Sequence, residues 1–151
     1  MRAVVQRVTS AICRVDGEIT GEIGAGMLVF LGVGQGDDAD DAGWLVRKIA
    51  ALRIFEDDEG RMNRSLVDSG GGVLVISQFT LYGNVKKGAR PSFNRSAPPA
   101  EATALYEHFK QQLATLLGHA VPSGVFAADM QIEAHNDGPV TLVIDTRQRD
   151  L

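Results

Sequence analysis

The sequence has 151 residues, which is enough for one domain with a hydrophobic core but too few for two independent domains. Hydrophobic residues make up 44% and charged residues 23%, as in ordinary globular proteins, and no apolar run is long enough to span a bilayer. The formal net charge of -4 argues against a general polyanion binder, because nonspecific nucleic-acid affinity comes from clustered Lys and Arg. We therefore expect a soluble protein with one domain over residues 1–151.

The cysteine count and the first residues indicate the compartment. Cys13 is the only cysteine, so no internal disulfide can form. This is typical of a protein in a reducing compartment. The opening "MRAVVQRVTS" has no apolar core that leads to a small-residue cleavage site, so it does not resemble an export signal. The sequence predicts a cytoplasmic protein.

The first third of the chain predicts two strands and then a helix. Residues 2–15 are rich in β-branched residues, and residues 26–34 form a short apolar run closed by glycines. Residues 16–26 between them are rich in turn formers. Residues 38–55 then change to a helical pattern, with acidic residues at the expected N-terminus. The apolar positions of this helix are Leu45, Ile49 and Leu52.

The middle of the chain predicts a hairpin, a buried strand and a long loop. Residues 53–63 have the pattern of a hairpin with its tip at residues 58–60. Residues 71–83 form the most apolar strand of the chain. Residues 84–99 contain glycine and proline breakers and no periodicity, so they predict a long loop, and long loops in compact domains are often functional.

The last third predicts a second helix and a closing hairpin. Residues 98–118 are amphipathic, with prolines at the start and a glycine at the end. Residues 128–135 and 139–146 are predicted to pair as a hairpin around Asn136-Asp137-Gly138, which already supplies the residues of a tight turn. Pro139 is therefore unexplained by the turn. The second helix is predicted to bury Leu105, Phe109, Leu113 and Leu116.

These elements predict one α+β domain with two main helices. The sheets are expected to be mixed or antiparallel and barrel-like. We find no repeat, linker or low-complexity tract in the sequence.

The glycine-rich segment at residues 32–38 lies between a strand and a helix, where a phosphate-binding loop would lie. Its spacing fits neither nucleotide fingerprint. A pyrophosphate would also meet four acidic side chains there, and the helix dipole is satisfied by them instead. We interpret the segment as a glycine turn before an acid-capped helix. The four acidic residues are Asp37, Asp38, Asp40 and Asp41.

No metal or cofactor is expected. The three histidines are not paired at the spacing of metal ligands, and no cysteine accompanies them. They are His108, His119 and His135.

The segment "SQFT", residues 77–80, places polar side chains at the end of a buried strand. One interpretation is that Ser77 and Thr80 satisfy neighbouring backbone groups. The other is that hydroxyls and N–H groups face a reacting carbonyl, as an oxyanion site or a nucleophile requires. No "GxSxG" elbow is present and no histidine is close in sequence, so a conventional triad cannot be assigned.

The loop that follows is locally basic on an acidic protein. No acidic residue occurs between Asp68 and Glu101. With Tyr82 and Phe93 nearby, the loop has the residues to contact phosphates and to stack on a base, although a simply solvated loop is the alternative. The candidate RNA-binding residues are Lys86, Lys87, Arg90 and Arg95.

Across almost its whole length the sequence resembles the bacterial D-aminoacyl-tRNA deacylase (D-tyrosyl-tRNA deacylase) family. The two most specific motifs, "SQFT" and "NDGPVT", are intact. A departure is Ala127, where family members more often have glycine, and this affects loop detail only. The other matching segments are "QRV", "VDGEITGEIGAGMLVFLGV", "LRIFEDDEGRMNRS", "KKGARPSF" and the "LYG" after "SQFT".

The resemblance implies hydrolysis of the ester that joins a D-amino acid to the 3′-terminal ribose of tRNA, with glycine mischarged on tRNA(Ala) as a further acyl group. It also implies a cytoplasmic homodimer without a metal. By the same resemblance, Ser77, Gln78, Phe79 and Thr80 line the pocket, and the N–H of Phe79 or Thr80 is the oxyanion donor. Two mechanisms remain open. In one Thr80 is the nucleophile, and in the other the 2′-hydroxyl of the terminal adenosine activates water.

The resemblance also assigns a role to Gly138 and Pro139, as a Gly-cis-Pro element that enters the active site of the other subunit. A cis bond before proline lies only about 0.5 to 1 kcal/mol above trans, and it redirects the flanking carbonyls toward a substrate α-ammonium. An L-amino acid would then clash with the Gly-Pro backbone, whereas glycine would not. In the same picture Arg7 holds this segment and Met130 lies near the pocket.

Two other functions remain open. One is a noncatalytic module that binds RNA 3′ ends through the basic loop, which predicts salt-sensitive tRNA binding without release of the amino acid. The other is a related deacylase directed at a different mischarged tRNA.

Overall fold

The strand β1 (Arg2–Val15) is the centre of the sheet, because every other long strand except β6 pairs with it. Its first half pairs antiparallel with β3 (Gly26–Gly32), and its second half pairs antiparallel with β2 (Glu18–Ile23). On its other side β1 pairs antiparallel with β7 (Gln131–Asp145). The computed structural model describes residues 1–150.

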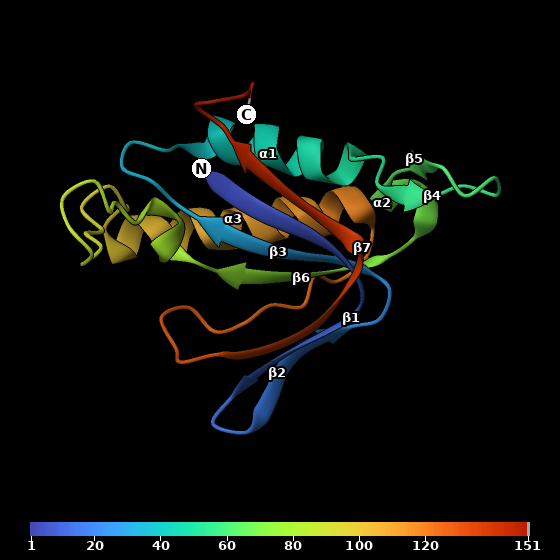
Figure 1. Cartoon of the computed structure of the whole chain (residues 1–151), viewed down its shortest axis with the longest axis horizontal. Coiled ribbons are helices and arrows are strands. Elements are labelled where there is room, and N and C mark those ends of the chain that lie inside the picture. Colours follow the sequence, from blue (N-terminus) through green and yellow to red (C-terminus); the bar gives the residue numbers. More distant parts are fainter. Residues whose placement is uncertain (151) are drawn as a thin grey trace.

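The sheet is completed by β6 (Gly72–Ser77), which runs parallel to β3. The result is a five-stranded mixed sheet that curls into a half-barrel (Figure 1). The remaining elements are α1 (Ala39–Ala51), the short hairpin β4 (Phe55–Glu56) and β5 (Met62–Arg64), the single-turn α2 (Leu66–Ser69), the 3-10 helix η1 (Phe79–Tyr82), and α3 (Pro99–Leu117).

The larger hydrophobic core lies between the sheet and the helices α1 and α3, which pack against each other. Alternation along β3 decides which side chains face this core: Met27, Val29 and Leu31 lie in it, whereas Leu28 points to the opposite face. That opposite face holds a smaller buried cluster inside the curl of the sheet, made of Val8, Ala11, Cys13, Leu28, Leu74 and Ile76. Both faces of the central strands are therefore buried.

The predicted α+β class, mixed sheet and two main helices are confirmed. The interpretation of residues 32–38 is confirmed as well, because Asp38 caps α1 and accepts hydrogen bonds from the N–H groups of Asp40 (3.0 Å) and Asp41 (3.1 Å). The predicted hairpin also forms, with the N–H of Gly60 bonded to the Asp57 carbonyl at its tip. Within residues 1–150, no helix is both long and apolar enough to cross a membrane.

Residues 16–26 contain the turn that their composition indicates, at Asp16-Gly17 (φ 49° and 81°), but the strand β2 that follows it was not predicted. On α3, Phe109 and Leu113 are fully buried as predicted and Leu105 is partly buried, whereas the prediction for Leu116 is wrong, since it is 42% exposed. Tyr106, which was not predicted, is buried and donates its hydroxyl to the Val75 carbonyl at 3.1 Å.

The predicted closing hairpin is also wrong. Residues 131–145 form one strand, and its two halves pair with the same strand β1 in the same antiparallel sense. The pairing is interrupted between Asn136, which lies opposite Val8, and Thr141, which lies opposite Gln6. Four residues of β7 therefore lie opposite the single residue Arg7. We call residues 137–140 the β7 bulge.

Candidate active site

A cavity of about 780 Å³ opens where β6 ends, and we call it the strand-end cavity. Its walls come from five parts of the chain: Gln35 in the loop before α1, the end of β6 with the start of η1, the loop at residues 93–97, the first turn of α3, and residues 126–132. Because β6 is buried over residues 73–76, its rigid end fixes the polar segment that follows it. The lining is mostly apolar with a few polar side chains, as in pockets for small ligands.

The polar side of the cavity is made by "SQFT". Ser77, Gln78 and Phe79 line the cavity, as predicted, whereas Thr80 is not among the lining residues. The N–H groups of Phe79 and Thr80 lie in the first turn of η1 and have no acceptor within that helix. Two adjacent N–H donors at the edge of a cavity are the arrangement that a developing oxyanion requires.

The Thr80 hydroxyl has an amide as its neighbour. It is exposed and accepts a hydrogen bond from Nε2 of Gln78. An amide cannot accept the proton that a nucleophilic hydroxyl must lose. Among the described residues, no carboxylate or imidazole is hydrogen-bonded to the Thr80 hydroxyl to serve as the base that a nucleophile needs.

An aromatic pair stands at the mouth of the cavity. The rings of Phe79 and Phe93 meet edge to face, with centroids 5.1 Å apart, and are 54% and 37% exposed. The Ser96 hydroxyl donates to the Phe79 carbonyl at 3.1 Å and so ties the loop to η1. Exposed aromatic faces at a cavity mouth are suited to stacking on a base or on an apolar ligand group.

The wall opposite "SQFT" was not found by sequence reasoning, apart from Met130. It consists of residues 126–130, and Ala127 adopts a left-handed backbone (φ 64°) there. This conformation agrees with the expectation that glycine is more common at this position. Asp129 is the one carboxylate, and no histidine or cysteine is present, among the described residues that line the cavity.

Gly138 and Pro139 lie outside this cavity, in the exposed β7 bulge. The bond between them is cis. Arg7, which is 6% exposed, supports the bulge from below: its Nε donates to the Asp137 carbonyl (3.0 Å) and its Nη1 to the Ile54 carbonyl (2.7 Å). Asn136 closes the base of the bulge, since its Oδ1 accepts from the Val140 N–H at 3.0 Å.

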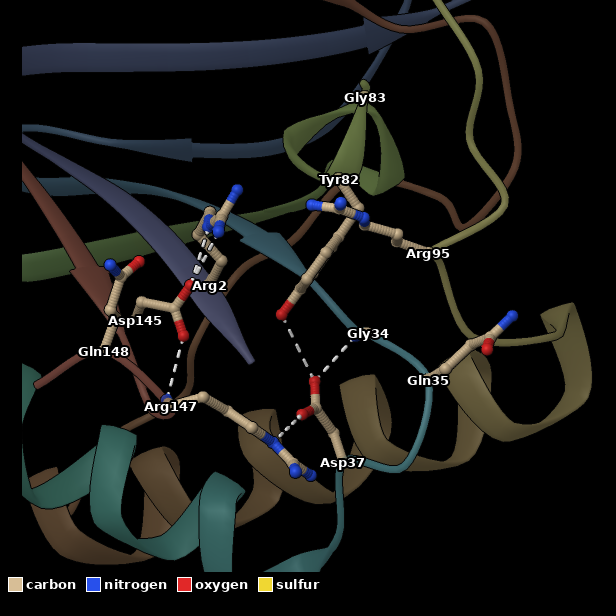
Figure 2. Close-up of a pocket in the computed structure, with 10 residues that line it drawn as sticks. All are labelled: Arg2, Gly34, Gln35, Asp37, Tyr82, Gly83, Arg95, Asp145, Arg147 and Gln148. Atoms are coloured by element: carbon tan, nitrogen blue, oxygen red, sulfur yellow. Dashed lines mark hydrogen bonds and ion pairs between the residues drawn. The ribbon is translucent and has the colours of Figure 1, made fainter. Parts of the chain in front are cut away.

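The predicted basic residues are all exposed but do not form one patch. Lys86, Lys87 and Arg90 surround a hollow of about 320 Å³, which we call the lysine hollow. Asn94 lines both this hollow and the strand-end cavity, so the two adjoin. Arg95 instead faces a third pocket, shown in Figure 2.

The pocket of Figure 2 has a volume of about 480 Å³, and we call it the arginine pocket because Arg2, Arg95 and Arg147 line it. In its wall, Asp145 pairs with Arg2 (2.8 Å). Tyr82 lies between Arg2 and Asp37, and partial burial, followed by the charge of Asp37, raises the pKa of its hydroxyl. Tyr82 therefore stays protonated as a hydrogen-bond donor at neutral pH. Arg2, Asp37 and Arg147 were not predicted as site residues.

Within residues 1–150 there is no cluster of three or more His, Cys, Asp or Glu side chains that is arranged to hold a metal ion.

Comparisons with known proteins identify the family of this chain. The family model described as D-Tyr-tRNA(Tyr) deacylase matches residues 4–145. A protein of Opitutus terrae named D-aminoacyl-tRNA deacylase is 59% identical over 150 residues, which cover 99% of this chain and 100% of that protein. A protein of Chromobacterium violaceum with the same name is 53% identical over 97% of this chain and 98% of that protein.

Two solved structures share the fold. One, described as a c-Myc DNA unwinding element binding protein, superposes with a TM-score of 0.90 at 40% identity, covering 96% of this chain and 98% of that one. The other, from a structural analysis of a probable eukaryotic D-amino acid tRNA deacylase, has a TM-score of 0.76 at 18% identity, with 95% and 97% covered, and shows likeness of fold alone. From the near-complete family match and the identity to curated relatives, this chain belongs to the D-Tyr-tRNA(Tyr) deacylase family.

Proposed function

We propose that this chain hydrolyses the ester of D-aminoacyl-tRNA and releases free D-amino acid and tRNA. The observation that carries the proposal is the strand-end cavity, which combines the unpartnered N–H groups at the start of η1 with an apolar, aromatic-edged wall. Such a cavity suits a terminal nucleoside that carries an acyl group. Membership of the family supports the same substrate class.

In this proposal the carbonyl oxygen of the ester lies against the N–H groups of Phe79 and Thr80, which stabilise its negative charge as water attacks the carbonyl carbon. The bond from that carbon to the 3′ oxygen then breaks, and the 3′ oxygen takes up a proton. Because the Thr80 hydroxyl has no base beside it, the 2′-hydroxyl of the terminal adenosine is the better candidate to orient and activate the water.

The β7 bulge is proposed to select the D-enantiomer. It is exposed and lies outside the cavity of its own chain, so in a homodimer it is free to enter the cavity of the partner. Carbonyls of Gly138 and its neighbours would receive the α-ammonium, and an L side chain would clash with the backbone there. Glycine lacks that side chain, so glycyl-tRNA(Ala) is proposed as a further substrate. In this picture Arg7 positions the bulge and Met130 closes the far wall.

The free edge of β7 supports the homodimer. Within residues 1–150, β7 pairs only with β1, so one edge of a strand of 15 residues carries unpaired backbone groups. Its apolar side chains Leu142 (36%) and Val143 (48%) are exposed. A long, apolar, unpaired edge suits an interface with a second copy.

The remaining parts of the proposal concern RNA and environment. Lys86, Lys87 and Arg90 adjoin the cavity and are proposed to contact the phosphates of tRNA. No step of the proposed reaction uses a metal or cofactor. A tRNA substrate places the enzyme in the cytoplasm.

The direct test measures release of labelled tyrosine from D-Tyr-tRNA and from L-Tyr-tRNA by the same preparation. We expect release from the D-ester only, with and without a chelator. Equal rates for the two enantiomers would contradict the selector. Salt-sensitive tRNA binding without release from either ester would favour the noncatalytic RNA-binding module. Release from another mischarged tRNA, but not from D-Tyr-tRNA, would favour the related deacylase.

A further inference from the structure

The arginine pocket adjoins the strand-end cavity through a thin wall. Gln35 lines both spaces, and its N–H donates to the Arg95 carbonyl at 3.0 Å while its Nε2 donates to the Asn94 carbonyl at 2.7 Å. Gly34 and Ser96 form an antiparallel bridge in the same wall. Asn94 and Arg95 are the central residues of a turn that the Ser96 N–H closes on the Phe93 carbonyl at 3.1 Å. Asn94 and Ser96 line the cavity, whereas Arg95 lines the arginine pocket.

The carboxylates of the arginine pocket are already satisfied. Oδ2 of Asp37 accepts from the Gly34 N–H (2.6 Å) and pairs with the Met1 ammonium (2.7 Å), and its Oδ1 pairs with Nε of Arg147 (3.3 Å). Oδ2 of Asp145 accepts from Arg2, and its Oδ1 accepts from the Arg147 N–H at 2.9 Å. All four carboxylate oxygens therefore have donors, as the dashed lines in Figure 2 show for most of these contacts.

The groups of the pocket that are still free to bind a ligand are hydrogen-bond donors. Within residues 1–150, the Arg95 side chain makes no hydrogen bond or ion pair, and Nη1 of Arg147 makes none either. Arg147 is held in place by Asp37, Asp41 and the Gly36 carbonyl and is still 56% exposed. The guanidinium group of Arg147 is thus held with a free N–H donor and that of Arg95 has all its donors free, and such groups match the geometry of a phosphate group.

We propose that the arginine pocket binds the phosphate that joins the terminal adenosine of the substrate to the preceding nucleotide, with Arg95 and Arg147 as its ligands. The proposal rests on the proposed function, which places the terminal nucleoside in the strand-end cavity. If the terminal nucleoside of an RNA chain fills that cavity, the rest of the RNA has to cross the rim of the cavity. On the side of Gln35 this path leads to the free N–H groups of Arg95 and Arg147. The lysine hollow then contacts RNA further from the 3′ end.

The test compares the dissociation constants of two probes without an acyl group, adenosine and the dinucleotide CpA. They differ by one phosphate and one nucleoside. We expect CpA to bind about five- to tenfold more tightly than adenosine, and Arg95→Gln and Arg147→Gln each to remove most of that difference. The binding of CpA should also become less sensitive to salt in each variant, because a charged contact to its single phosphate is lost.

A matched control separates this site from general charge effects. Arg61→Gln changes a guanidinium that is 77% exposed in the β4–β5 hairpin, outside every pocket described above, and it should not alter the ratio of CpA to adenosine affinity. Equal affinities of CpA and adenosine in the wild type, or a ratio unaffected by Arg95→Gln and Arg147→Gln, would overturn the proposal. The proposal would also be overturned if inorganic phosphate bound in a way that depends on Arg95 while CpA bound no more tightly than adenosine, because that result indicates a site for free phosphate.

Because these probes measure binding, the result does not depend on ester hydrolysis. A chain that binds CpA through Arg95 but leaves D-Tyr-tRNA intact would retain this inference and lose the proposed function.

Discussion

Thr80 is the residue that distinguishes the two candidate mechanisms, a nucleophilic hydroxyl and a backbone oxyanion donor. Its hydroxyl accepts from the Gln78 amide and lies outside the cavity lining, whereas its N–H stands in the first turn of η1. Substitution of the side chain leaves that N–H in place. The structure therefore separates the contribution of the hydroxyl from that of the backbone.

We predict that Thr80→Val lowers kcat/KM for D-Tyr-tRNA by less than about tenfold, whereas a 2′-deoxy terminal adenosine lowers it by about 10²- to 10⁴-fold, the usual range for a lost general acid or base. Single-turnover release of labelled D-tyrosine measures both. An inactive Thr80→Val enzyme that binds tRNA normally, together with normal cleavage of the 2′-deoxy substrate, would make Thr80 the nucleophile.

The predictability of the site also differs from residue to residue. Ser77, Gln78 and Phe79 are contiguous, and a polar segment after a buried strand is visible in the sequence. Ala127 and Asp129 belong to an irregular segment with no periodicity, and only the folded chain brings them opposite β6. Arg95 was singled out for its charge, but its separation from Lys86 depends on the turn at residues 93–96, which directs it to another pocket.

At the scale of elements, the β7 bulge depends on a glycine at residue 138. Gly138 has φ 132°, and a Cβ there would lie 2.8 Å from Cγ2 of Val140 and 3.2 Å from Nη2 of Arg7. A side chain would thus be strained by the backbone and would press on the arginine that supports the bulge.

We predict that Gly138→Ala lowers the free energy of unfolding by about 1 to 3 kcal/mol and reduces deacylation of D-Tyr-tRNA. Urea denaturation measures the first effect. The matched control is Gly24→Ala, because a Cβ at Gly24 meets no atom within 4 Å. A Gly138→Ala protein as stable as the Gly24→Ala protein would show that the bulge accommodates a side chain.

The same element explains the largest error of sequence-based prediction here. The sequence Asn136-Asp137-Gly138 correctly indicates a break in regular pairing, but a turn signal does not specify whether the chain reverses its direction. That depends on β1, which is long enough to pair with both halves of β7. Helix α1 was predicted well because its cap and its apolar spacing are local features.

At the scale of the whole molecule, the proposed function requires two copies. We predict a solution mass of twice the 16.2 kDa chain mass, measured by light scattering. Val143→Lys should shift the mass toward that of one chain and lower deacylation, because a charge on the exposed edge opposes association and removes the bulge of the partner.

The control for this change is Val67→Lys, on α2, where the valine is 56% exposed and is not part of the β7 edge. It should leave the mass at twice that of one chain. A wild-type chain that is monomeric and still rejects L-Tyr-tRNA would contradict selection by a partner.

The β7 bulge also has a consequence for how this fold can change over evolutionary time. Because Asn136 and Thr141 resume pairing with β1 on either side, the bulge can change in length, or in sequence at Asp137 and Pro139, while every other strand keeps its register. Among the bulge residues, Val140 packs against the larger hydrophobic core and Gly138 is required by its backbone, so these two positions are the constrained ones. A fold of this kind can acquire a new preference for the acyl group by exchanging one short segment.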